Sequence, residues 1–570
     1  MRKNLLLTTV AGLAAFIIHA GPDSSPVQAQ AAAALTGQVS SAREGPMEGV
    51  VVSARKDGST ISISVVSDDK GRYRFPAAKL EPGHYALKIR AIGYELDGAH
   101  AADVKTGATA TADIKLSPTK NLAAQLTNSE WLASMPGSDQ QKKFLLSCNS
   151  CHSYQPIVNS THDADEFLQV FDRMTGYYPG STPLQPQRLV GTARRNLSGG
   201  AGSAMAGEGG MSSDPRAKAA AEWLATANLS KGPTHDYAFK TLPRPAGRAT
   251  RMVVTEYDLP RKTIEPHDVI VDTDGMVWYS DFGALFLGKM DPKTGKVTEY
   301  PIPRIKEGFP VGTLDLETDR DGNLWVAMMY QGGIAKLDKK TGKVQTWSVP
   351  KDWQTDATQQ SFASPTFSHV DGKVWVKNSD RAQILRLDLA TNTWENFGTF
   401  TDPETKRTFG SYGINADHNN NLYMLDFNAG NLGILDGSTR KLEIQRTAIA
   451  NSRPRRGSVD DQNRLWFAEY DGNAIGVLDP KTRQIREWSV PTAWSNPYDV
   501  VVDKNGEAWT GSMMSDRVVR LDTKTNQFTE YLLPNPTNIR RVWIDNSTNP
   551  VTFWVGSNHG ASIVKLEPLD

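Results

Sequence analysis

The stretch PHDVIVDTDGMVWYSD (residues 266–281) decides the fold, because it is one copy of a unit that returns along the rest of the chain. Its Asp274-Gly275 pair is a tight-turn signal between two arms that carry apolar residues, which predicts a β-hairpin. A strand that ends in proline often follows, as in VTEYPIP (297–303). The aromatic residue of the second arm returns at gaps of 43 to 50 residues: Trp278, Trp325, Trp375, Tyr423, Trp466, Trp509 and Trp554.

Four short strands in each of seven such repeats are typical of a β-propeller. The last repeat ends after its third strand, at Lys565-Leu566-Glu567. A candidate for its missing fourth strand, VTEYDLP (254–260), stands before the first repeat. Pairing the two would close the ring and hide two strand edges that otherwise promote aggregation. We therefore expect a seven-bladed propeller over residues 250–570.

Residues 35–117 contain short strand-like stretches separated by closely spaced turn signals, and this pattern predicts a small β-sandwich. The motifs GVVV (49–52), DKGRYRF (69–75) and LEPGHY (80–85) resemble the carboxypeptidase regulatory-like, transthyretin-like family. That resemblance implies a non-catalytic spacer or adhesion unit. We expect no chemistry in this block.

The residue pattern of 125–231 differs from the strand-like pattern before it and predicts an α-helical domain. Helices are expected at residues 130–135, 139–148, 163–177 and 214–229, the last with Pro215 in its first turn, where a missing N–H is harmless. A stretch rich in Gly, Ala and Ser, residues 199–210, is expected to be a loop. The fold class is thus multidomain and mostly β: sandwich, helical domain and propeller.

Length, charge and the first residues narrow the functional classes. A chain of 570 residues has room for three or more domains at roughly 100–200 residues each. Lys plus Arg and Asp plus Glu both total 63, so the zero net charge argues against a nucleic-acid binder. Arg2 and Lys3, an apolar stretch over 5–18 and Ala29-Gln30-Ala31 have the layout of a secretory signal over residues 1–31. The apolar stretch is too short for an ordinary membrane span, so we expect a periplasmic or extracellular protein without a transmembrane span.

The strongest chemical signal is Cys148-Asn149-Ser150-Cys151-His152. C-x-x-C-H attaches one haem c, with both thiols bound to the vinyl groups and the histidine as an iron ligand. A zinc site would need two further soft ligands, and the chain has no other cysteine. A thioredoxin-like redox pair would need a βαβ context that this helical block lacks. The block resembles monohaem cytochrome c domains over about a hundred residues.

The sixth iron ligand is expected to be Met174, which follows a helical stretch after His152 and lies in an Arg-Met pair resembling that of some periplasmic cytochromes. Met205 and Met211, in the loop before the last helix, remain alternatives, and His162 would give a bis-histidine iron. A methionine ligand would raise the reduction potential relative to two histidines.

The propeller repeats at 266–281 and 465–480 resemble the virginiamycin B (streptogramin B) lyase family. The resemblance implies metal-dependent opening of a cyclic depsipeptide ester by elimination, with acidic residues and a histidine at the channel mouth. The family's Glu-x-His pattern, with an acid 14 residues on, maps onto Glu265, His267 and Asp281. Two features depart from it: the acid is aspartate, and Arg540-Arg541 stands where a second histidine is expected.

The positions of Glu265, His267 and Asp281 in the predicted hairpin indicate the same three residues, independently of the resemblance. His267 and Asp281 are equally far from Asp274, so an antiparallel hairpin should place them opposite each other. Glu265, His267 and Asp281 are therefore predicted to share one rim and do acid–base work, unless the histidine is only hydrogen-bonded to a carboxylate there. A divalent cation such as magnesium would take Glu265, Asp281 and Glu469. The rim should further hold Glu469, Arg455, Arg456, Tyr498 and Arg540.

Three functions follow from these motifs. The first is an exported haem c electron-transfer protein whose propeller binds a small-molecule substrate or a periplasmic redox partner. The second is a metal-dependent lyase-like enzyme, and the third is a binding scaffold without catalysis. The C-x-x-C-H motif favours the first, because haem supplies nothing to a redox-neutral elimination.

Overall fold

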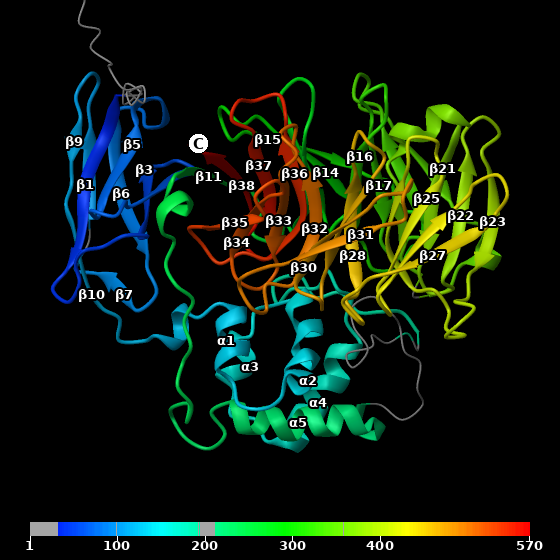
Figure 1. Ribbon diagram of the computed structural model, residues 1–570, viewed down its shortest axis with the longest axis horizontal. Helices are drawn as coiled ribbons and strands as arrows, with labels where there is room; N and C mark the ends of the chain where they lie inside the picture. The colour runs from blue at the N-terminus through cyan, green and yellow to red at the C-terminus, as the bar shows by residue number, and fades with distance from the viewer. Residues whose placement is uncertain (1–31, 99, 192, 194–210, 357) are drawn as a thin grey trace, which may run out of the picture.

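The computed structural model describes residues 32–570 apart from 99, 192, 194–210 and 357. A β-sandwich, a ring of sheets and a helical block occupy three sides of the molecule (Figure 1). The predicted signal segment, the loop 199–210 and Met205 lie outside the described residues. Within the described part of the chain, no helix is long and apolar enough to cross a membrane.

Six four-stranded antiparallel sheets follow one another along residues 266–532, and each is one blade. Blades 1 to 3 are β12 (Pro266–Val271), β13 (Val277–Asp281), β14 (Phe286–Met290), β15 (Val297–Pro301); β16 (Thr313–Thr318), β17 (Leu324–Met328), β18 (Gly333–Leu337), β19 (Val344–Ser348); and β20 (Gln360–Phe362), β21 (Lys373–Asn378), β22 (Gln383–Asp388), β23 (Thr393–Thr399). Blades 4 to 6 are β24 (Ser411–Ala416), β25 (Leu422–Asp426), β26 (Asn431–Leu435), β27 (Leu442–Arg446); β28 (Pro454–Val459), β29 (Leu465–Glu469), β30 (Ala474–Leu478), β31 (Ile485–Ser489); and β32 (Pro497–Val502), β33 (Ala508–Ser512), β34 (Arg517–Asp522), β35 (Gln527–Leu532).

The seventh blade joins the two ends of the ring. It contains β36 (Ile539–Asp545), β37 (Thr552–Ser557), β38 (Ser562–Pro568) and β11 (Met252–Asp258). β11 pairs with β38 in antiparallel register, with Val254 opposite Leu566. The predicted closing strand is therefore confirmed.

The sandwich is built from ten strands: β1 (Ala33–Ser41), β2 (Gly45–Pro46), β3 (Val51–Lys56), β4 (Ile61–Val66), β5 (Arg72–Pro76), β6 (Gly83–Arg90), β7 (Tyr94–Leu96), β8 (His100–Val104), β9 (Ala110–Thr111) and β10 (Ile114–Pro118). One of its sheets does not end at the domain boundary. β4 pairs with β11, with Val65 opposite Val253, so blade 7 and the sandwich form one eight-stranded sheet in the order β36-β37-β38-β11-β4-β3-β6-β8. Val51 and Val66 accordingly pack in one buried cluster with Val254 and Leu566.

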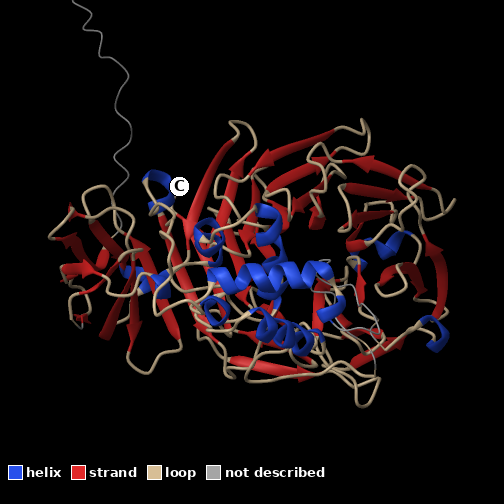
Figure 2. Cartoon of the chain, turned by 90° about the horizontal axis from the view of Figure 1, so that it is seen from below, coloured by secondary structure: helices blue, strands red, loops and turns tan. Residues whose placement is uncertain are grey.

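The helical block, residues 123–227, lies across one face of the ring (Figure 2). Its elements are α1 (Asn128–Ser134), α2 (Asp139–Lys142), the 3₁₀ helix η3 (Lys143–Ser150), α3 (Gln155–Val158), α4 (Ala164–Thr175) and α5 (Pro215–Ala227). Asp163 caps α4, and Asp214 caps α5 with Pro215 in its first turn, so both helices begin where the sequence predicts. The expected helix over 139–148 is instead a short α-helix that continues as 3₁₀.

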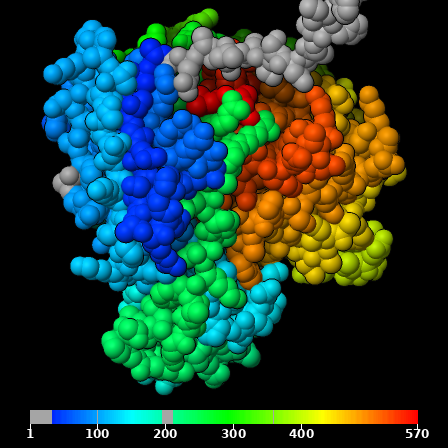
Figure 3. Space-filling view, turned by 60° about the vertical axis from the view of Figure 1, so that its left-hand side comes forward, coloured from blue at the N-terminus to red at the C-terminus, as the bar shows by residue number. Residues whose placement is uncertain are grey.

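The helical block shares its core with the propeller. Trp131 and Leu224 belong to the same buried cluster as Tyr470, Tyr498 and Met513, which come from blades 5 and 6. The linker after α5 runs in the seam between the sandwich and the propeller, where Figure 3 draws it in green. It is held there by Arg517, whose Nη2 donates to Pro243 O at 2.6 Å. The three parts therefore pack as one body.

In several blades the recurrent tryptophan is hydrogen-bonded to an aspartate that stands just before the hairpin turn. In blade 2, Asp319 Oδ1 accepts from the backbone N–H groups of Asp321 (3.0 Å) and Asn323 (2.9 Å), and Oδ2 accepts from Trp325 Nε1 (2.9 Å). One carboxylate thus fixes the hairpin turn and satisfies the buried indole N–H. The same indole bond recurs at Trp278–Asp272, Trp466–Asp460 and Trp509–Asp503.

Replacing this carboxylate tests the role of the turn. Asp319→Ala should lower the free energy of unfolding by about 2–4 kcal/mol, because it leaves a buried indole donor and two turn amides without their acceptor. Asp321→Ala, in the same turn but exposed, should change it by no more than about 0.5 kcal/mol. Denaturant unfolding of the three proteins measures both values. Equal losses from the two substitutions would contradict this role.

Candidate functional site

Both cysteines face one cavity of about 550 Å³ in the helical block, which we call the thiol cavity. Cys148 lies near the end of η3, and Cys151 and His152 follow directly. Met174, on α4, lines the same cavity. Most of the remaining wall is apolar and includes Ile157, Phe167, Val170, Phe171 and Leu224.

The alternatives for the sixth ligand are placed differently. His162 also lines the thiol cavity, and its Nδ1 lies 3.5 Å from Glu166 Oε2. Met211 is buried in the core behind the cavity, and its backbone N–H donates to Asp172 Oδ1 at 2.5 Å. Of the two candidate methionines among the described residues, Met174 lines the cavity of the thiols and Met211 does not.

The two residues between the cysteines are bound to the propeller. Asn149 Nδ2 donates to Met513 O at 2.9 Å, and Asn149 O accepts from Asn538 Nδ2 at 3.2 Å. Ser150 O accepts from Arg540 Nη2 at 2.6 Å. Since Asn149 and Ser150 are both buried, blades 6 and 7 fix the backbone that carries the thiols. Arg540, which the sequence placed on the rim, thus anchors the C-x-x-C-H segment.

A β-bulge changes the predicted register of His267. Asp281 is paired with Pro266, whereas Tyr279 is paired with Val269, so the register shifts by one residue at His267-Asp268. His267 is therefore not opposite Asp281, and that prediction is wrong. Counting from the turn assumes an unbroken ladder, and a bulge adds one residue to one strand only.

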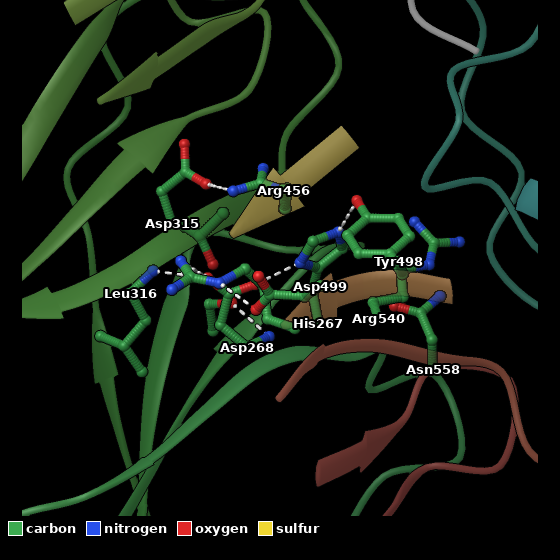
Figure 4. A network of polar contacts seen from close by, with 12 residues as sticks. His267, Asp268, Asp315, Leu316, Arg456, Tyr498, Asp499, Arg540 and Asn558 are labelled. Atoms are coloured by element: carbon green, nitrogen blue, oxygen red, sulfur yellow. Dashed lines mark hydrogen bonds and ion pairs between the residues drawn. The ribbon is translucent and has the colours of Figure 1, made fainter. Parts of the chain in front are cut away.

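The same shift occurs in the inner strand of six blades, in every blade except blade 3. A bulge re-aims side chains, and here it directs them into a polar network that joins the inner strands of several blades (Figure 4). We call this the axial network. Its bulge residues are His267, Asp268, Asp315, Tyr412, Arg455, Arg456, Tyr498, Asp499 and Arg541.

Hydrogen bonds connect the network across blades. His267 Nδ1 contacts Asp268 Oδ1, and His267 Nε2 lies 3.1 Å from Tyr498 OH. Tyr498 OH in turn lies 2.8 Å from Tyr412 OH. On the other side, Arg541 donates to Asp268 at 3.3 Å, Asp499 at 3.1 Å and Glu317 at 2.9 Å. A second ion pair joins Arg456 to Asp315.

Burial and charge set the protonation states in this network. Burial lowers the pKa of His267 to about 3 despite Asp268, so its imidazole is neutral at pH 7. Burial would raise the pKa of Tyr412, but the guanidinium groups of Arg455 and Arg456 lower it to about 7. The Arg455 guanidinium lies over the rings of Tyr498 (4.1 Å) and Tyr412 (4.7 Å).

The carboxylates of Glu265 and Asp281 both lie close to Gly283, where an added Cβ would be 3.1 Å from Glu265 Oε1 and 3.6 Å from Asp281 Oδ1. Asp281 Oδ1 accepts from the backbone N–H of Glu265 (3.2 Å) and of Gly283 (3.0 Å), and Asp281 Oδ2 pairs with Arg261 at 3.2 Å. Burial raises the pKa of Glu265 well above its usual range, and Arg540 opposes this. The structure thus brings together Glu265 and Asp281, but not His267.

Glu469 is not part of that pair. It ends β29 in blade 5, and burial raises its pKa to about 8, with Ser452 opposing this and Glu487 adding to it. Within the described residues, no group of three or more His, Cys, Asp and Glu side chains is placed to hold a metal ion. Among the described residues, Glu265, Asp281 and Glu469 thus do not form the three-ligand cluster that the sequence predicts for a divalent cation.

The helical block covers the end of the ring where the rim was predicted. Tyr178 OH donates to Phe282 O at 2.9 Å, and the side chains of Gln185 and Gln187 donate to Gly283 O at 2.6 and 3.0 Å. Glu265 is 2% and His267 1% exposed. All the residues that the sequence assigns to the rim are buried in the structure: Glu265, His267, Asp281, Arg455, Arg456, Glu469, Tyr498 and Arg540.

Sequence reasoning missed His559 and Asn558. Both lie in the turn between β37 and β38, and both line a second cavity together with Cys151 and His152. A single Asn-His pair in a hairpin turn carries no recognisable motif. Only the packing of blade 7 against the helical block reveals the position.

The comparisons with known proteins agree with the fold in two regions. Residues 399–568 match the virginiamycin B lyase family, and residues 34–117 match the carboxypeptidase regulatory-like domain. The first match covers less than half of the chain, so it shows a propeller similar to that family's and no more. No curated protein matches the chain.

Solved structures show similar folds at low identity. A streptogramin B lyase aligns with 57% of this chain and 100% of its own, at 21% identity and a TM-score of 0.47. Virginiamycin B lyase from Staphylococcus aureus covers 55% of this chain and 98% of its own, at 20% identity and 0.46. An extracellular domain of a one-component system from B. thetaiotaomicron covers 53% and 40%, at 16% identity and 0.41. Such values carry no argument about activity.

The charge environment of Tyr412 can be tested by titration. With a pKa of about 7, Tyr412 should give a tyrosinate absorption step near neutral pH that disappears in Tyr412→Phe. Because the ordinary value is 10.0, the unfolded state binds the proton more tightly between about pH 7 and pH 10. The unfolding free energy of the wild type relative to Tyr412→Phe should therefore rise across that window. Arg455→Met should move the step to higher pH, and an unchanged step in both variants would contradict the assignment.

Proposed function

We propose that this chain is an exported haem c electron-transfer protein in which the propeller is the scaffold that holds the haem-attachment segment. The observation that carries the proposal is the thiol cavity, where Cys148, Cys151, His152 and Met174 share one apolar enclosure. Export is proposed from the layout of residues 1–31.

The residues of the cavity fit a haem group. A cavity of about 550 Å³ is in the range that binds small cofactors, and its largely apolar lining suits a porphyrin face. Cys148 and Cys151 would hold the group covalently, and His152 and Met174 would be its iron ligands. When bound, a c-type haem supplies reversible one-electron transfer.

The chain's own residues then set the properties of the site. Phe167 and Phe171 are buried and give the cavity an apolar wall. An apolar wall and a methionine ligand would both favour the reduced iron and so raise the reduction potential. Arg540 and Asn538 of the propeller donate to Ser150 O and Asn149 O, and Asn149 Nδ2 donates back to the propeller at Met513 O. These hydrogen bonds hold the attachment segment against the propeller.

The lyase-like alternative has weaker support. His267 is buried under the helical block, and its hydrogen bonds to Asp268 and Tyr498 occupy both ring nitrogens. A macrocyclic ester would have to displace Tyr178, Gln185 and Gln187 to reach it. We therefore propose a small-molecule ligand or a periplasmic electron-transfer partner for this protein, and no ester elimination.

Absorption spectra test the proposal. Protein exported from a host with haem c maturation should show a sharp reduced α band after dithionite, and Cys148→Ser with Cys151→Ser should abolish covalent haem. Met174→Ala should lower the reduction potential and allow an added ligand such as imidazole to bind the ferric iron. Met211→Ala is the matched control, since Met211 lies outside the cavity, and it should retain the wild-type spectrum.

Two results would contradict these assignments. A folded, colourless protein would overturn the haem proposal. A loss of the methionine-ligated spectrum in Met211→Ala, with Met174→Ala unchanged, would overturn the choice of Met174.

A further inference from the structure

Arg540 is a buried cation of blade 7 that lies against the C-x-x-C-H segment. Its side chain is 2% exposed. Nη2 donates to Ser150 O at 2.6 Å, and Nε donates to Asn538 Oδ1 at 2.9 Å. The guanidinium also lies over the ring of Phe282, 4.9 Å from its centroid. Because Ser150 directly precedes Cys151, the propeller places a charged group beside the backbone that carries the second thiol.

The partners of Arg540 are neutral, and this sets it apart from its neighbours in the axial network. Arg456 is paired with Asp315, and Arg541 contacts three carboxylates. Arg540 forms no ion pair with any residue that the structure describes, since its hydrogen bonds go to a backbone carbonyl and an amide. An arginine side chain stays protonated in proteins, so Arg540 carries a permanent positive charge.

Glu265 is the acid whose charge could cancel that of Arg540 from a greater distance. Burial raises the pKa of Glu265 well above its usual range, although Arg540 favours the ionised form. A neutral carboxyl group does not compensate a cation. Asp281, the other acid near Gly283, is paired with Arg261 at 3.2 Å. The charge of Arg540 is therefore uncompensated in a buried setting, where charges act more strongly than in water.

Such a charge would affect the two oxidation states of a haem iron unequally. Oxidised iron carries one more positive charge than reduced iron, so a buried cation close to the attachment segment destabilises the oxidised state more. The environment of the cofactor is one of the means by which a protein sets its reduction potential. The hydrogen bond from Arg540 to Ser150 O is a separate, geometric contribution of the same side chain.

We propose that Arg540 raises the reduction potential of the haem through its positive charge, in addition to holding Ser150 against the propeller. The inference rests on the proposed function, because it requires haem at Cys148 and Cys151. It gives the propeller a part in the redox chemistry: the helical block supplies the thiols and the iron ligands, and blade 7 supplies a fixed charge.

Potentiometric titration of the full exported protein, followed at the reduced α band, tests this inference. Arg540→Gln removes the charge and keeps an amide donor, whereas Arg540→Lys keeps the charge. At the wild-type midpoint potential, Arg540→Gln should lower the ratio of reduced to oxidised protein about ten-fold, which is about 59 mV for one electron. Arg540→Lys should retain most of the wild-type potential, and Glu265→Gln should leave it unchanged.

Two controls separate charge from structure. Arg386→Gln makes the same change in net charge. Arg386 is likewise largely buried and donates to a backbone carbonyl, Gly437 O, at 3.0 Å, but it lies in blade 3 and is paired with Glu395. Its substitution should change the ratio less than about two-fold. The methionine-ligated ferric spectrum should persist in Arg540→Gln, which would show that the iron ligands have not changed.

Other results would overturn the proposal. A haem-containing Arg540→Gln protein with the wild-type potential would exclude the effect, and equal losses in Arg540→Gln and Arg540→Lys would assign it to the hydrogen bond. An equal loss in Arg386→Gln would show that it is not local. A higher potential in Glu265→Gln would show that Glu265 is ionised and cancels Arg540.

A second variant covers failure of Arg540→Gln to fold. Asn538→Asp gives Arg540 a carboxylate partner and should also lower the potential, and an unchanged potential would overturn the proposal. A folded protein without haem would overturn the proposed function together with this inference. Haem with an unshifted potential would overturn this inference alone, so the two failures are distinguishable.

Discussion

Residues 252–258 are hydrogen-bonded along both edges of one strand, with β38 on one side and β4 on the other. The first pairing closes the propeller, and the second attaches the sandwich. Because β11 lies inside the shared sheet and not at its edge, neither domain has an unpaired strand edge at their boundary. The second cavity, which His152 and His559 line, depends on this strand too, because its walls also include sandwich residues such as Ile89 and Arg90, and β11 joins the sandwich to blade 7.

Like β11, the helical block connects separate parts of the fold, in this case at one end of the ring. Beneath it, the bulged inner strands gather arginines and carboxylates that would be costly to bury unpaired. Arg541 alone contacts three carboxylates from blades 1, 2 and 6: Asp268, Glu317 and Asp499. The same end of the ring supplies Arg540 and Asn538, which fix the segment between the cysteines. Propeller and attachment segment are therefore parts of one polar framework.

The sequence predicted those features that rest on local rules. Turn aspartates and tryptophans repeat, so blade number and the closing strand followed from spacing, and capping residues such as Asp214 located a helix start. The bulge at His267-Asp268 was not predictable, since no residue type in this strand marks it and only the pairing with β13 shows the register shift. Two further features depend on contacts between segments far apart in the sequence: the pairing of β4 with β11, and the burial of Glu265 under the helical block. No local sequence pattern predicts such contacts. The C-x-x-C-H segment was found by motif, but its shared cavity with Met174 required the fold.

The shared strand also has a consequence for how the chain folds. β4 and β11 can pair before any blade of the propeller has formed, whereas β38 follows six complete blades along the chain. Contacts so far apart in sequence form slowly, and until then the second edge of β11 remains exposed. The seven residue pairs that close one ring would equally join β11 of one molecule to β38 of another. Ring closure is therefore the stage at which this fold competes with domain-swapped assembly.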